Sequence, residues 1–183
     1  IWPFISLAWN TKNGITDLQT AEKALLGGKT SEAQKYITSA RNSFTTGKED
    51  LGRTIWLFNL LGKQNDYHSF LRLLDLGQKG SHSAVHLFLA AKFYSEAGSA
   101  ILSGGSNKLS DKLNSGQEEL ATADDGLAFL QAELVKGNLN VPGPLWLKNL
   151  LGAKDLDQKI KTLTLKFSSW RQYLSQARVL GQI

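Results

Sequence analysis

The sequence predicts an all-α protein: an elongated antiparallel up-and-down bundle of four to five helices, forming a single domain over residues 1–183. Three observations predict this fold. Apolar residues recur at alternating steps of three and four, which places them on one stripe of a helix. Glycines separate these stripes, and the connections are short, as between antiparallel neighbours. No stretch alternates apolar and polar residues as a half-buried strand would.

The stripes define the expected helices in order. The first helix ends at Gly27-Gly28, and Thr30 or Ser31 is expected to cap the second, which runs to Gly62. The third covers roughly 67–103 and the fourth 109–134. The stripe expected on the third is rich in small residues: Phe70, Leu74, Gly77, Ser81, Ala84, Phe88, Ala91, Ser95, Gly98 and Leu102. A Pro/Gly break at 137–144 and a short helix over 145–151 precede the last helix, from about 154 to 180. The stripe expected on the second helix is Ala33, Ile37, Ala40, Phe44, Gly47 and Leu51, with Ile55 and Phe58 continuing it.

Composition excludes several classes of protein. The chain has no cysteine, so zinc ribbons, disulfide scaffolds and thiol catalysis are ruled out. It has no run of about 20 apolar residues that could cross a bilayer. The apolar opening over residues 1–9 has two readings: a first helical turn packed on the domain, or the outer end of a trimmed membrane helix.

Candidate catalytic and metal-binding motifs are weak, so we expect no enzyme, no cofactor and no metal site. His82 and His86 lie four residues apart on one helix face, a spacing that suits zinc, but His68 is too far along the helix to be a third ligand. The "GGKT" run over 27–30 lacks the first glycine and the preceding strand of a phosphate-binding loop. The acidic pair Glu118 and Glu119 is expected to be solvated.

One internal echo stands out: "WLFNLLG" over 56–62 and "WLKNLLG" over 146–152. Trp56 and Trp146 are expected to close equivalent ends of the bundle, with Gly62 and Gly152 as left-handed helix terminators. The alternative is a pair of docking patches for a partner, which requires both indoles to be exposed.

The net charge of +5 comes entirely from residues 158–183. Because these side chains scatter around the helix, we interpret them as the solvated flank of a core helix; the alternative is a surface for an anionic envelope polymer or another partner, but not nucleic acid. The five basic residues are Lys159, Lys161, Lys166, Arg171 and Arg178.

The order of segments resembles the helical region of bacterial domain-of-unknown-function family 4012. The resemblance rests on "AEKALLGGKTSEAQKYITSARNSF", "IWLFNLLG", "LSDKLNSGQEEL" and "LSQARVLGQI". It implies a single-pass membrane protein that lies mostly outside the cytoplasm of a bacterium. The anchor would precede Ile1, and a more distinctive domain would follow Ile183.

The sequence therefore predicts a non-catalytic scaffold, interaction or stalk module of a membrane-anchored envelope protein. Candidate docking residues are Trp56, Trp146, Lys159, Lys166, Arg171 and Arg178. The alternative is an extracytoplasmic ligand-sensing bundle of chemoreceptor type, in which Arg72 and His86 contact a small molecule held between helices.

Overall fold

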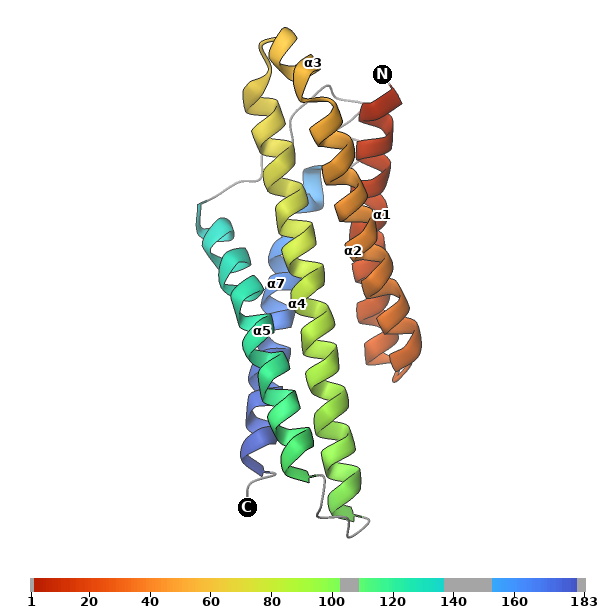
Figure 1. Ribbon diagram of the computed structural model, residues 1–183, viewed down its shortest axis with the longest axis vertical. Coiled ribbons are helices and arrows are strands. Elements are labelled where there is room, and N and C mark those ends of the chain that lie inside the picture. The colour runs from red at the N-terminus through yellow and green to blue at the C-terminus, as the bar shows by residue number, and fades with distance from the viewer. Residues whose placement is uncertain (1, 103–108, 137–152, 181–183) are drawn as a thin grey trace.

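The computed structural model describes residues 2–102, 109–136 and 153–180, which form helices and no strand, so the all-α class is confirmed (Figure 1). The helices are α1 (Trp2–Leu26), α2 (Thr30–Arg53), α3 (Ile55–Leu60), α4 (Gln64–Leu102), α5 (Leu109–Val135) and α7 (Ala153–Leu180).

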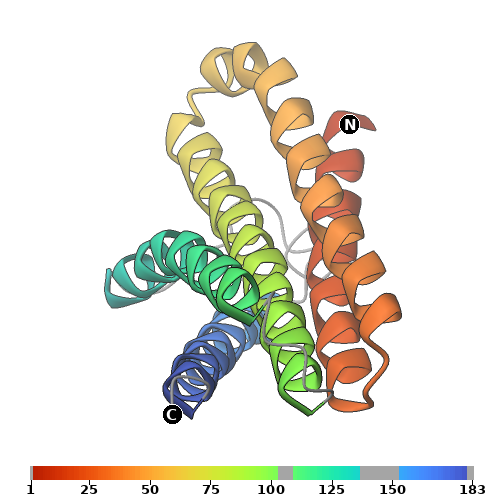
Figure 2. The same ribbon diagram turned by 60° about the horizontal axis from the view of Figure 1, so that its bottom comes forward.

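Helix α4 is the central element. It contacts each of the other five described helices. The pair α1 and α2 lies on one side of it, and α5 and α7 lie on the other (Figure 2). Its 39 residues, at about 1.5 Å each, make it about 58 Å long, which gives the molecule its elongated shape.

The stripe predicted for α2 is confirmed residue by residue between Ala33 and Leu51. The prediction for α4 covered only part of what is buried. Phe70, Leu74 and Ala84 are buried as expected, but a second face carrying Leu73 and Leu87 is buried too. A helix with neighbours on two sides must bury two faces, whereas a single stripe assumes one.

The predicted second helix was too long. It breaks at Thr54 into α2 and α3, so six helices are described where four to five were expected. The amide and the hydroxyl of Thr54 both donate to the carbonyl oxygen of Leu51, at 3.0 and 2.8 Å, and this local bonding competes with continuation of the helix. After the break, Ile55 is 43% exposed, against expectation, while Phe58 is buried.

The predicted helix ends are partly confirmed. Gly28 and Gly62 adopt φ values of 72° and 63°, the left-handed conformation that glycine tolerates best. The expected cap was wrong: Thr30 already belongs to α2, and the capping residue is Lys29, with no side-chain capping bond.

The ring of Phe44 determines how closely α1, α2 and α4 approach. A Cβ atom on Gly77 would lie 2.3 Å from this ring, and one on Gly14 would lie 2.7 Å from it. The two glycines are therefore required by packing, because any side chain there would displace Phe44.

The apolar opening of the chain joins the fold as part of α1. Leu7 and Ala8 are buried, whereas Ile5 and Trp9 of the same segment are exposed. None of the helices described is long and apolar enough to cross a bilayer. The break at 137–144, the short helix at 145–151 and Gly152 lie outside the described residues.

Candidate functional site

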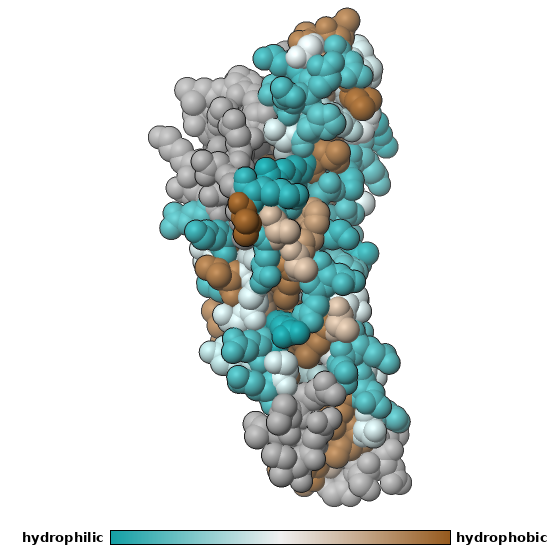
Figure 3. All heavy atoms as spheres, turned by 90° about the vertical axis from the view of Figure 1, so that its left-hand side faces the viewer, coloured by the Kyte–Doolittle hydropathy of each residue, from teal (hydrophilic) through white to brown (hydrophobic). Residues whose placement is uncertain are grey.

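A cluster of exposed apolar side chains lies at the end of the molecule that carries α3. We call Ile55, Trp56, Leu60 and Leu61 the α3 patch. Trp56 is 63% exposed and Leu60 is 74% exposed. The face shown in Figure 3 is largely hydrophilic, with apolar residues at this tip and in further patches along the middle of the molecule. Exposed apolar side chains that lie next to one another indicate a contact surface.

One residue of α3 points inward and holds the helix in place. Phe58 is 4% exposed, and its ring meets those of Tyr67 and Phe70 edge-on, with centroids 5.6 and 6.3 Å apart. Because Phe58 anchors α3 to α4, the patch is presented on a fixed element.

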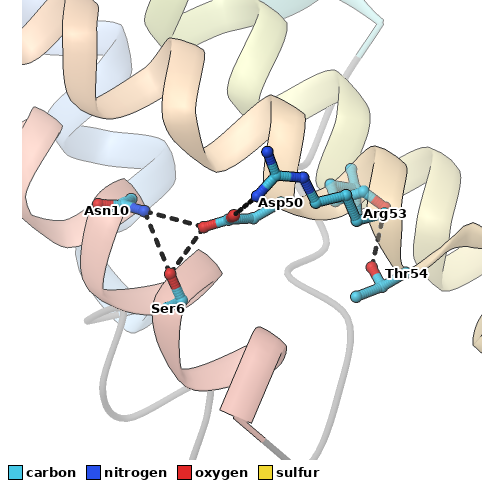
Figure 4. Close-up of polar contacts among 6 residues, drawn as sticks. Ser6, Asn10, Asp50, Arg53 and Thr54 are labelled. Carbon is cyan, nitrogen blue, oxygen red and sulfur yellow. Dashed lines mark hydrogen bonds and ion pairs between the residues drawn. The ribbon is translucent and has the colours of Figure 1, made fainter.

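A polar network fixes α1 to α2 just before α3 (Figure 4). Asp50 of α2 accepts hydrogen bonds from the Ser6 hydroxyl at 2.7 Å and the Asn10 amide at 3.2 Å, both in α1. Arg53 lies 3.7 Å from the other carboxylate oxygen of Asp50. The first turns of α1 are thereby tied to the same end as the α3 patch.

Two further apolar side chains of α1 are exposed at this end. Ile5 is 40% exposed and Trp9 is 56% exposed. The N-terminus and α3 lie at the same end of the molecule (Figure 1). Paired docking patches would require both Trp56 and Trp146 to be exposed. Trp56 is exposed, and Trp146 lies outside the described residues.

The basic residues predicted on α7 are partly neutralised by other helices. Lys166 forms an ion pair with Glu22 of α1. Arg171 makes a two-bond contact with Asp124 of α5, at 2.8 and 2.7 Å, and this carboxylate raises the pKa of Arg171 above its ordinary value. Lys159 is half-buried with no ion pair to another described residue, and the side chain of Arg178 lies outside the described part.

Arg72, a ligand contact under the ligand-sensing alternative, is held by the carboxylate of Glu133. Its Nε donates to Glu133 Oε2 at 2.5 Å and its terminal nitrogen donates to the Glu133 carbonyl at 2.8 Å. Lys136 also bonds this carboxylate, and Lys136 and Arg72 together hold the pKa of Glu133 below its ordinary value against the opposing effect of burial. Arg72 therefore joins α4 to α5.

The two histidines His82 and His86 also lie at the contact between α4 and α5. The rings of His82 and His86 meet edge-on, 4.4 Å apart, and His86 Nδ1 lies 2.5 Å from Glu119 Oε2 of α5. Burial lowers the pKa of His82, and His86 lowers it further. No three His, Asp or Glu side chains among the described residues are placed to hold a metal ion.

Sequence reasoning missed the acidic partners of these bases. Glu119 was expected to be solvated, but it is partly buried against His86. Glu133 was not singled out, and Asp124 was noted only as part of an acidic doublet with Asp125. These carboxylates could have been recognised from the sequence because they lie next to the buried stripe of α5, which includes Leu120, Ala123 and Leu130. A carboxylate in that position faces a neighbouring helix.

An apolar pocket of about 220 Å³ lies between the end of α1, the middle of α4 and α7. Its lining includes Leu25, Phe88 and Trp170. Neither Arg72 nor His86 lines it, so the expected ligand contacts and the pocket do not coincide.

No protein-family model matches the sequence, and no curated protein or solved structure is detectably similar to it. The family resemblance described above therefore stays a prediction.

Proposed function

We propose that the chain is a non-catalytic scaffold or stalk module of a membrane-anchored bacterial envelope protein, an antiparallel up-and-down bundle whose α3 end faces the bilayer on the extracytoplasmic side. The single observation that carries this proposal is the concentration of exposed Trp56, Leu60 and Leu61 at the end where α1 begins.

The chemistry of this end suits a membrane surface. Tryptophan is enriched at the boundary between water and lipid, where its ring is buried and its N–H remains hydrated. Arg53 and Lys63 flank α3 and are both exposed, so their cationic ends can reach lipid phosphates while the patch contacts acyl chains. An anchor preceding Ile1 would hold α3 against the bilayer.

The rest of the molecule supports a mechanical role. Its polar groups between helices are engaged with one another, as Arg72 with Glu133 and Arg171 with Asp124. The length of α4, about 58 Å, would carry a following domain well away from the membrane.

Co-sedimentation with vesicles of phosphatidylcholine and phosphatidylglycerol tests this orientation. We expect the chain to sediment with vesicles and the double variant Trp56→Ser, Leu60→Ser to remain in solution, because the apolar contact is lost. Tyr173→Ser is the matched control, since Tyr173 is exposed on α7 and should not matter.

Two results would contradict the proposal. If the double variant binds vesicles as well as the unchanged chain, α3 does not face the bilayer. If the chain dimerises in analytical ultracentrifugation and the double variant is monomeric, the α3 patch is covered by a second copy instead.

A ligand-sensing role is the second candidate function. The apolar pocket between α1, α4 and α7 favours it, since small-molecule sites are concave and mostly apolar.

A further inference from the structure

We propose that the pocket between α1, α4 and α7 binds a small, neutral bicyclic aromatic molecule of the size of indole. The inference deepens the ligand-sensing alternative and rests on the pocket alone, so the scaffold proposal does not depend on it.

The pocket exists because the helices end at different levels. Helix α1 stops at Leu26, while α4 and α7 continue beyond it (Figure 1). The residues of α4 and α7 at this level, Phe88 and Trp170 among them, therefore lack one neighbour. The ion pair of Glu22 with Lys166, about one turn before Leu26 and Trp170 in their helices, joins α1 to α7 at this level.

The pocket has a buried floor and an exposed rim. Leu87 and Phe88 of α4 form the floor and are 2% and 8% exposed. Trp170 of α7 lies partly buried at the side. Leu26 and Tyr173 at the rim are 74% and 69% exposed, so a ligand can enter without a helix unfolding.

Volume and lining determine the class of ligand. An engineered protein cavity of about 150 Å³ with aliphatic and aromatic walls binds benzene, so about 220 Å³ suits a molecule of roughly nine non-hydrogen atoms. The aromatic rings of Phe88 and Trp170 favour a flat aromatic partner. No charged side chain among the described residues lines the pocket, so a carboxylate would be desolvated without a partner there.

Binding of 5-fluoroindole to the whole chain, followed by ¹⁹F NMR, tests this inference. We expect saturable binding to the unchanged chain. Ala91→Leu places a larger side chain in the pocket and should weaken binding by about tenfold or more, whereas Ala121→Leu, on an exposed face of α5, should leave binding unchanged.

Two further measurements keep the test decisive if Ala91→Leu disturbs the fold. Leu26→Asp adds a charge at the exposed rim, where folding is least affected, and should also weaken binding. A fluorinated indole-3-carboxylate should bind about tenfold more weakly than 5-fluoroindole. The inference is overturned if 5-fluoroindole does not saturate, if both rim and pocket variants bind it normally, or if the carboxylate binds equally well.

Discussion

At the level of Gly77 in α4, the ring of Phe44 fills the space over Gly14 and Gly77, and the cavity beside it, lined by residues of all five long helices, measures only about 30 Å³. Farther along α4, where α1 ends, Phe88 lies under a pocket of about 220 Å³. Both regions are lined by apolar side chains. The difference therefore arises from where the neighbouring helices end and how closely their backbones approach, and hydrophobicity alone does not decide it.

Replacing the two phenylalanines gives the largest expected effect. Phe44→Ala should lower the free energy of unfolding by about 3–5 kcal/mol, because it empties a closely packed site. Phe88→Ala should cost clearly less, because part of its surroundings is already empty. Urea denaturation of both variants measures this, and equal losses of unfolding free energy would remove the contrast between the two regions.

Substituting glycine in α4 should have the next largest effect. Gly77→Ala places a Cβ atom 2.3 Å from the Phe44 ring, so it should destabilise the protein by about 1–3 kcal/mol. Gly98→Ala is the control in the same helix. No atom outside the local helix backbone lies within 4 Å of a Cβ atom placed on Gly98, so this change should stabilise the protein by up to about 1 kcal/mol. A stabilising Gly77→Ala would show that Phe44 can move aside.

The ion pair between α4 and α5 should affect how the free energy of unfolding falls on acidification. Because the folded pKa of Glu133 lies below its ordinary value of 4.5, the unfolded chain takes up this proton first. The contribution of Glu133 is present above about pH 4.5 and is lost as the pH falls through the folded pKa. Glu133→Gln should therefore flatten the decline in unfolding free energy on acidification, while Glu49→Gln, at an exposed site, should not. An unchanged decline in Glu133→Gln would contradict the pairing.

The smallest expected effect concerns His82, which lies in α4 between Gly77 and Phe88. Its pKa is lowered by burial, by His86 and by Arg41 of α2 and Lys79, and Glu119 of α5 opposes them. Protonation therefore favours the unfolded chain, and this contribution is complete above pH 6.5 and declines below it.

Thermal unfolding over this pH range is the measurement for His82. His82→Gln should reduce the loss of stability below pH 6.5, and His68→Gln, at an exposed position of the same helix, is the control. If the two variants lose stability equally below pH 6.5, the surroundings of His82 do not lower its pKa enough to affect folding.

The same contrast explains what could be predicted from sequence. The α2 stripe from Ala33 to Leu51 was predicted fully because α2 buries one face. For α4 only one of two buried faces was predicted, since the spacing rule does not reveal how many neighbours a helix has. The break at Thr54 was missed because the predicted apolar stripe continues across it to Phe58, which is buried on the far side of the break.

The candidate site was predicted less well than the fold. Trp56 was identified from a repeated motif, and its exposure supports it as a contact residue. Lys166 and Arg171 were identified from charge, but their partners Glu22 and Asp124 lie on distant helices. Such ion pairs depend on how the helices are aligned along one another, which the spacing of apolar residues does not specify. The pocket depends on the same alignment, because it forms where α1 stops beside α4 and α7.

The central claim, that the α3 end faces a bilayer, can be measured directly because the chain has no cysteine. Asn59→Cys in α3 and Ser110→Cys at the start of α5 each accept one environment-sensitive fluorophore, and the untethered chain is bound to vesicles of phosphatidylcholine and phosphatidylglycerol. The account predicts a blue shift and quenching by brominated lipid for the label at position 59 and neither for the label at 110. Equal responses at both positions, or a response at 110 alone, would contradict it.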